Sequence, residues 1–241
     1  MIENLSFINY EHHKKLVRTI LNDSMAKDEI IGLMLIGSVA RGDAYPDSDL
    51  DLYFLLENGY NKKFHSEIKG NILIEYKYAD FNQVQLNFDK NPMELYSFLD
   101  GKILFDNKGF LKQLMGIAQQ KYNAYYISEN KIKGISHWLN SSLIKINAAL
   151  KVNDVLKASY ILNTSTWVML EGIWVINNKP IPPSGSVLVH IKELSNKPTH
   201  LDDLLNKVFL GSTTERIHSA ILIIEWVLFN LEQQIDHSLL S

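Results

Sequence analysis

The sequence predicts an α+β fold, in which a mixed sheet flanked by helices is followed by an all-helical C-terminal domain. Three short runs rich in apolar, β-branched or aromatic residues have the length and composition of strands, at residues 33–36, 49–56 and 72–78, and a fourth short strand is predicted from residue 103, followed by a turn and a helix through residue 119. An amphipathic run at residues 11–25 precedes them and predicts a helix packed on the sheet. From residue 129 onward apolar residues recur at helical spacing, which predicts a helical C-terminal part.

Two domains are expected, residues 1–126 and residues 127–241. The strands predicted above all lie in the first domain. The second is interrupted at residues 180–184, where three prolines prevent a helix from continuing. Four helices are predicted in this domain. The first starts near residue 129, the second covers about residues 154–176, the third covers residues 201–209, and the last has an apolar face over residues 217–231.

The composition indicates a substantial core and no thiol chemistry. Hydrophobic residues make up 46% of the 241 residues, and the chain contains no cysteine. This excludes disulfides and thiolate catalysis and is typical of a reducing compartment. The N-terminal residues lack the pattern of a signal peptide, and the apolar run at residues 220–231 contains Glu225 and is too short for a membrane span. We therefore expect a soluble cytoplasmic protein without a membrane partner.

The charge distribution argues against a polynucleotide substrate. The formal net charge is −3; residues 1–126 carry 17 acidic and 14 basic side chains, and residues 127–241 carry 10 of each. Neither half offers the basic surface that a polynucleotide backbone requires. The charge therefore favours a small molecule over a polynucleotide as the substrate.

The stretch from residue 33 to residue 51 carries the strongest functional signal. A predicted strand leads into Gly37 and Ser38, whose backbone and hydroxyl are suited to grip phosphate oxygens. The next strand opens with Asp49 and Asp51, and residues two apart on a strand point to the same face. Two such carboxylates repel one another unless a cation lies between them, and oxygen ligands suit Mg²⁺. The pattern predicts a site for one or two Mg²⁺ ions and a nucleoside triphosphate.

This pattern resembles the nucleotidyltransferase signature of the polymerase-beta-like superfamily: a hydrophobic strand, Gly-Ser, a spacer, and Asp-x-Asp on the next strand. The matching residues are Gly37, Ser38, Arg41, Gly42, Ser48, Asp49 and Asp51. The resemblance implies that the two aspartates are catalytic and hold Mg²⁺, and that Gly37, Ser38, Arg41 and Ser48 bind the nucleotide. A solvent-facing arginine is the alternative for Arg41, and an acidic turn solvated between two strands is the alternative for the whole motif.

A third carboxylate is expected on a neighbouring strand. Glu75 is the only acid within residues 72–78, and the apolar residues Ile74 and Tyr76 on either side resemble the third acidic position of the superfamily. Glu75 could complete the metal site or take the proton from the acceptor hydroxyl. A solvent-facing glutamate on an edge strand is the alternative, and Asp80 is the reserve candidate.

Residues 103–119 and the helical C-terminal part resemble the kanamycin nucleotidyltransferase branch of antibiotic-modifying enzymes. In that branch a C-terminal helix supplies a glutamate base, with a lysine about one turn later. Lys145 matches the lysine, which implies a role in nucleotide binding, but Ser141 and Ser142 occupy the turn where the glutamate would stand. Glu171 lies on the next predicted helix, where an exposed or hydrogen-bonded role is expected.

The sequence therefore predicts an enzyme, a nucleotidyltransferase. It would move a nucleoside monophosphate from a nucleoside triphosphate to a hydroxyl of a small acceptor and release pyrophosphate. The resemblance suggests an aminoglycoside or lincosamide antibiotic as the acceptor. One alternative is an antitoxin-type nucleotidyltransferase that binds or AMPylates a helical protein. Another is a nucleotide-binding fold without turnover, which the intact carboxylates disfavour.

A homodimer is also predicted. The kanamycin branch places its active site between subunits, which implies a shared site here. In addition, Trp167, Trp174 and Trp226 lie in predicted helices that are too apolar for a thin domain to bury, and leftover apolar surface usually marks an interface. The alternative is a monomer whose helices bury these side chains against the sheet.

Overall fold

The computed structural model describes residues 5–238, with side chains up to residue 234. The chain divides into two compact units. The first comprises the described residues up to Ala124 together with Pro182–Val189, and the second comprises Tyr125–Ile181 and the described residues from His190 onward. The boundary predicted between residues 126 and 127 assigned Pro182–Val189 to the second domain, whereas the structure groups this late segment with the first unit.

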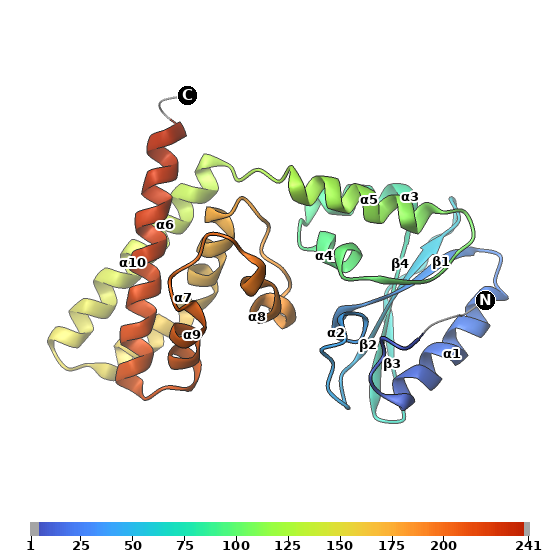
Figure 1. Ribbon diagram of the computed structural model, residues 1–241, viewed down its shortest axis with the longest axis horizontal. Helices are drawn as coiled ribbons and strands as arrows, with labels where there is room; N and C mark the ends of the chain where they lie inside the picture. Colours follow the sequence, from blue (N-terminus) through green and yellow to red (C-terminus); the bar gives the residue numbers. More distant parts are fainter. Residues whose placement is uncertain (1–4, 239–241) are drawn as a thin grey trace. The chain divides into compact units, whose positions relative to one another are not determined.

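A five-stranded mixed sheet forms the centre of the first unit, in the order β3-β4-β2-β1-β5 (Figure 1). β2 and β4 are parallel, whereas the other neighbouring pairs are antiparallel. The predicted α+β class is thereby confirmed, although the edge strand β3 was not expected. The strands are β1 (Ile30–Ile36), β2 (Leu50–Leu56), β3 (His65–Lys69), β4 (Ile72–Asp80) and β5 (Lys102–Asp106).

Helices cover both faces of the sheet, which explains why the central strands are apolar throughout (Figure 1). Along β1, Leu33 and Leu35 pack toward α1, whereas Met34 packs toward α3, α4 and α5. All seven residues of β1 are buried, because a strand covered on both faces has no solvent-facing positions. The helices are α1 (Glu11–Met25), α3 (Phe81–Lys90), α4 (Glu94–Leu99) and α5 (Phe110–Asn123).

The second unit is built from long helices, as predicted. Its main helices are α6 (Glu129–Lys151), α7 (Val155–Ile176), α9 (Leu201–Leu210) and α10 (Thr213–Ser238). α6 and α10 both pack on α7. Gly172 permits a close approach, since a Cβ there would lie 2.4 Å from Cγ1 of Val227 on α10. Among the described residues, none of the helices combines the length and the hydropathy needed to cross a bilayer.

The late segment Pro182–Val189 joins the first unit after α7 has ended. It contains a short 3-10 turn, η1 (Ser184–Ser186), and the beginning of α8 (Val187–His190). η1 contacts α2 (Gly37–Arg41), the short helix that follows β1. This contact brings residues from the second half of the chain to the motif that carries the functional signal.

Candidate active site

The first strand leads directly into the predicted phosphate-binding turn. β1 ends at Ile36, and α2 begins at Gly37. Gly37 has a φ of +70°, where side chains are strained, and a Cβ at this position would lie 2.3 Å from Oδ2 of Asp51. The antiparallel pairing explains this proximity, because Asp51 on β2 is the partner of Ile36 on β1. Glycine is therefore required both by the backbone conformation and by the approach of the carboxylate.

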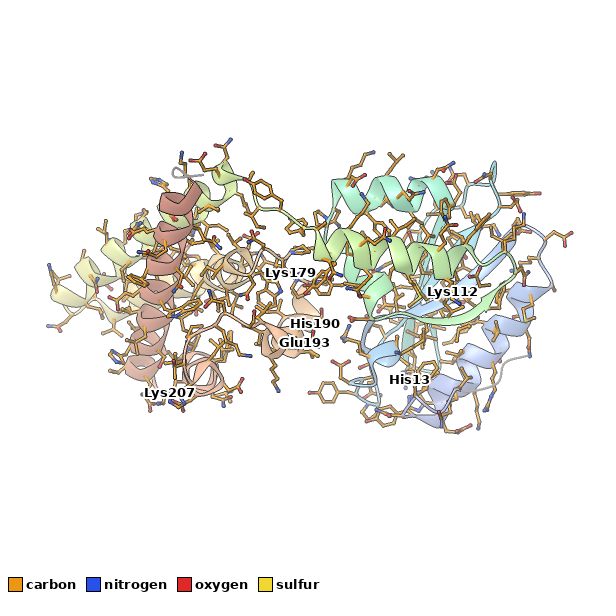
Figure 2. The ribbon with its side chains drawn as sticks, turned by 45° about the horizontal axis from the view of Figure 1, so that its top comes forward. His13, Lys112, Lys179, His190, Glu193 and Lys207 are labelled. Atoms are coloured by element: carbon orange, nitrogen blue, oxygen red, sulfur yellow. The ribbon has the colours of Figure 1, made fainter. Side chains whose placement is uncertain are left out.

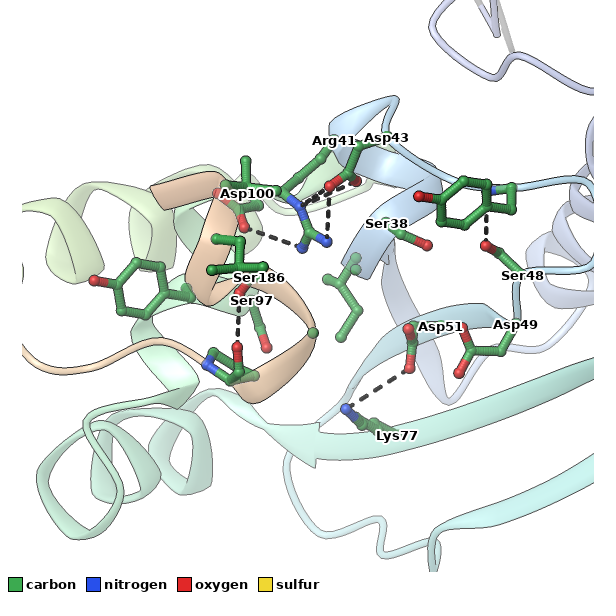
Figure 3. A pocket seen from close by; sticks show the side chains of 18 residues that line it. Ser38, Arg41, Asp43, Ser48, Asp49, Asp51, Lys77, Ser97, Asp100 and Ser186 are labelled. Carbon is green, nitrogen blue, oxygen red and sulfur yellow. Dashed lines mark hydrogen bonds and ion pairs between the residues drawn. The ribbon is translucent and has the colours of Figure 1, made fainter. Parts of the chain in front are cut away.

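A cavity of about 660 Å³ opens at this turn, and all of its lining residues belong to the first unit (Figure 3). The side chains of Asp49 and Asp51 lie next to one another in it, as the i, i+2 spacing predicted. Two of the predicted site residues, Glu75 and Lys145, do not line the cavity. The other six do: Gly37, Ser38, Arg41, Ser48, Asp49 and Asp51. The lining also includes three charged residues that sequence reasoning missed: Asp43, Lys77 and Asp100.

Asp51 lies in a crowded and largely buried environment, with a side chain that is 17% exposed. Its pKa is raised from 3.8 to about 7, chiefly because burial disfavours the charged form, although the positive charge of Lys77 opposes the shift. Asp49 and Glu75 add to the increase. Glu75 is the register partner of Asp51 on the parallel strand β4 and shares a side-chain hydrogen bond with it. The structure thus places Glu75 beside Asp51 and outside the cavity lining.

The carboxylates of the cavity fit a hard divalent cation. Asp49 and Asp51 supply oxygen donors, and the raised pKa of Asp51 indicates that the protein neutralises its negative charge only in part. A bound Mg²⁺ would supply the missing positive charge. Within residues 5–234, no group of three or more His, Asp and Glu side chains is drawn together closely enough to hold an ion. The participation of Glu75 as a third metal ligand therefore stays a prediction.

Arg41 faces two carboxylates and is largely shielded from solvent. Its guanidinium lies 3.2 Å from Asp43 and 3.4 Å from Asp100, and its side chain is only 14% exposed (Figure 3). This burial excludes the alternative of a solvent-facing arginine. Asp100 directly follows α4, so it approaches Arg41 from a distant part of the sequence. Because its charge is already balanced within the protein, a contact between Arg41 and phosphate stays a prediction.

Two histidines of α1 hold the turn that precedes β2. The Nε2 atom of His12 lies 2.7 Å from the carbonyl oxygen of Pro46, and the Nε2 atom of His13 lies 2.9 Å from that of Ser48. His13 is fully buried, and this burial lowers its pKa, although the bond to Ser48 opposes the shift (Figure 2). The neutral ring therefore donates its Nε2–H to the Ser48 carbonyl. No sequence signal connects a histidine on this helix with a turn 35 residues later.

One wall of the cavity comes from the late segment of the first unit. Its five lining residues are Pro183, Gly185, Ser186, Leu188 and Val189. Leu188 and Val189 are 51% and 38% exposed, so they present apolar surface. The cavity therefore combines a wall that bears the aspartates with a partly apolar wall.

Lys145 and Glu171 both belong to the second unit. Lys145 is exposed on α6, and its predicted role in nucleotide binding stays a prediction. Glu171 on α7 forms an ion pair with Lys131, with 2.6 Å between the charged atoms. The expectation of a hydrogen-bonded helical glutamate at this position is confirmed.

Comparison with known proteins agrees with the motif and the sheet. Residues 5–109 match the polymerase beta nucleotidyltransferase family model. The first unit is therefore a nucleotidyltransferase domain of the polymerase-beta-like superfamily, and the chain that carries it is a transferase. No curated protein matches the sequence at a significant level.

Among solved structures, a nucleotidyltransferase-like protein from Exiguobacterium sibiricum 255-15 is similar to this chain. The two are 13% identical with a TM-score of 0.43, and the alignment covers 89% of this chain and 74% of that one. A likeness at this level carries no argument about substrate. Membership of the kanamycin branch stays a prediction.

Proposed function

We propose that the protein catalyses the Mg²⁺-dependent transfer of a nucleoside monophosphate from a nucleoside triphosphate to a hydroxyl group of a small acceptor, with release of pyrophosphate. The observation that carries this proposal is the position of Asp49 and Asp51 in one cavity with Gly37 and Ser38. Groups suited to bind phosphate and carboxylates suited to bind a cation thereby lie together in a nucleotidyltransferase domain.

Asp49 and Asp51 would hold one or two Mg²⁺ ions. When bound, Mg²⁺ neutralises negative charge on the phosphate groups and on the oxygen that leaves. Gly37 lacks a side chain and so leaves room for phosphate oxygens beside the Asp51 carboxylate. Ser38 lines the same cavity and would donate its hydroxyl to a phosphate oxygen.

Glu75 is assigned a positioning role in this proposal. It hydrogen-bonds Asp51 from the neighbouring strand and does not line the cavity. Through this bond it would keep the Asp51 carboxylate oriented toward the cavity. This geometry favours support of Asp51 over direct removal of a proton from the acceptor.

The acceptor is proposed to be a small molecule. The cavity of about 660 Å³ lies in the range usual for small-molecule sites, and the acidic balance of the first 126 residues disfavours polynucleotides. An aminoglycoside or lincosamide is the first class to test, because the helical C-terminal part resembles the kanamycin branch. The apolar surface of Leu188 and Val189 offers a contact for the acceptor or for the nucleobase.

The decisive experiment incubates the protein with each nucleoside triphosphate, Mg²⁺ and a panel of antibiotics and cellular alcohols. Mass spectrometry should find one acceptor heavier by a nucleotidyl group, and Asp49→Asn should abolish that product. In parallel, calorimetry measures triphosphate binding without an acceptor. Modification of a helical protein that co-purifies would support the antitoxin-type alternative, and a protein that binds no triphosphate at all would overturn the proposal.

A further inference from the structure

The two cations that line the cavity, Arg41 and Lys77, are balanced in different ways. Arg41 has two carboxylate partners, at 3.2 Å and 3.4 Å. The Nζ atom of Lys77 lies 3.9 Å from Oδ1 of Asp51. This distance allows an ion pair but is too long for a hydrogen bond. The opposite charges of Asp51 and Lys77 therefore attract one another, but the N–H groups of Lys77 donate no hydrogen bond to Asp51.

The geometry of β4 explains why Lys77 reaches the cavity. Lys77 follows Glu75 by two residues, so both side chains leave the same face of the strand. In the parallel register Lys77 is the partner of Tyr53, two residues along from the Asp51–Glu75 pair. Its side chain is 35% exposed, and Figure 3 shows its amino group directed toward Asp51. The position of Lys77 is thus set by the sheet.

The partner of Lys77 is also a residue proposed to bind Mg²⁺. A divalent cation at Asp51 would take over the carboxylate and repel the ammonium group. Arg41 would keep both of its partners, Asp43 and Asp100, under the same conditions. A triphosphate that arrives with the metal presents anionic oxygens at the same place, and a lysine ammonium is a frequent partner of phosphate.

We propose that Lys77 is a substrate-binding residue with two successive partners. In the metal-free protein it offsets part of the negative charge of Asp51, and in the loaded protein it contacts the phosphate oxygens of the nucleoside triphosphate. This inference rests on the proposed function and deepens it, since it assigns phosphate binding to a residue outside the Gly-Ser and Asp-x-Asp motif. Lys77 therefore competes with the metal but assists the triphosphate.

The opposite effects on two ligands make the inference testable. Electron paramagnetic resonance measures the binding of Mn²⁺ without nucleotide, and calorimetry measures the binding of α,β-methylene-ATP and α,β-methylene-GTP at saturating Mg²⁺. The variants are Lys77→Met and Lys77→Gln, which remove the charge, and Lys77→Arg, which keeps it. Lys112→Met is the matched control, because Lys112 is an exposed lysine on α5 that does not line the cavity (Figure 2).

Removing the charge of Lys77 should raise the affinity for Mn²⁺ about threefold or more, as expected for the loss of a competing, partly exposed ion pair. The same variants should bind the triphosphate analogues about tenfold more weakly or worse. Lys77→Arg and Lys112→Met should resemble the wild type. A parallel fall in both affinities, or no change in either, would overturn the inference while wild-type binding upholds the proposed function. A wild-type protein that binds no analogue would overturn both.

Discussion

Replacing Asp51 by asparagine should stabilise the metal-free protein even though it removes a proposed catalytic group. Asp51 is 17% exposed, and its pKa is raised from 3.8 to about 7, mainly by burial. Between about pH 4 and pH 7 the Asp51 carboxyl is therefore protonated in the folded state and deprotonated in the unfolded state. Unfolding in this range releases the proton, so the free energy of unfolding of the wild type falls as the pH rises. Asparagine carries no charge at any of these pH values and avoids this loss.

The magnitude follows from the pKa. Moving one carboxyl from 3.8 to about 7 corresponds to roughly 4 kcal/mol at pH 8, at about 1.4 kcal/mol per pKa unit. The pKa already contains the attraction of Lys77, so the only further loss in the asparagine variant is a weakened hydrogen bond with Glu75, worth about 1 kcal/mol. The expected net gain in the free energy of unfolding is therefore about 3 kcal/mol at pH 8. It should vanish near pH 4, where Asp51 is protonated in the folded wild type.

Urea unfolding in EDTA at pH 4.5, 6 and 8 measures this difference. Asp23→Asn is the matched control, because Asp23 is exposed on α1 and its replacement should change stability by less than about 0.5 kcal/mol. Added Mg²⁺ should then stabilise the wild type more than Asp51→Asn. A variant that is less stable than the wild type at pH 8, or whose advantage is the same at all three pH values, would refute the reasoning.

Four further outcomes are expected. Asp49→Asn should abolish nucleotidyl transfer in the mass-spectrometric assay while the circular dichroism spectrum stays that of the wild type; turnover at the wild-type rate would contradict the assigned site. Ser38→Ala should weaken the binding of a non-hydrolysable triphosphate by roughly 1.5–3 kcal/mol in calorimetry, because one hydrogen bond to a charged group is lost; unchanged affinity would count against the role of this hydroxyl. His13 has a lowered pKa, so its protonation opposes folding and stability should fall as the pH drops below about 6.5. His13→Gln should flatten this dependence in thermal melts across pH 5 to 8, and an unchanged slope would exclude His13 as its source. Light scattering should give twice the 27.7 kDa chain mass if the predicted homodimer forms, and a mass of 27.7 kDa would rule it out.

The local part of the site could be predicted from the sequence because short-range geometry determines it. A strand that ends at Ile36 and a second that begins at Leu50 need only pair antiparallel to bring Asp51 next to Gly37. The i, i+2 spacing then places Asp49 beside it. Glu75 could also be expected near Asp51, since it is the only acid within its predicted strand, and the register of β2 and β4 places the two opposite one another.

The remaining parts of the site depend on contacts between distant residues. Asp100 pairs with Arg41 across 59 positions, and the late segment supplies Leu188 and Val189 to the cavity wall. Neither contact leaves a local pattern in the sequence. The physical argument for a dimer also changes, because Trp174 is completely buried within the structure, whereas Trp167 is 37% exposed. Trp174 therefore contributes no apolar surface to an interface.

The charges of the cavity give a reason why a triphosphate would need a divalent cation to enter. The formal charge of the lining side chains is −2, from four aspartates against one arginine and one lysine: Asp43, Asp49, Asp51, Asp100, Arg41 and Lys77. An anionic triphosphate would be repelled by such a surface in the absence of metal. Each Mg²⁺ adds two positive charges, so one ion brings the lining to neutrality and a second makes it attractive to phosphate. On this balance the metal acts in binding as well as in chemistry, and triphosphate affinity should depend steeply on Mg²⁺ concentration.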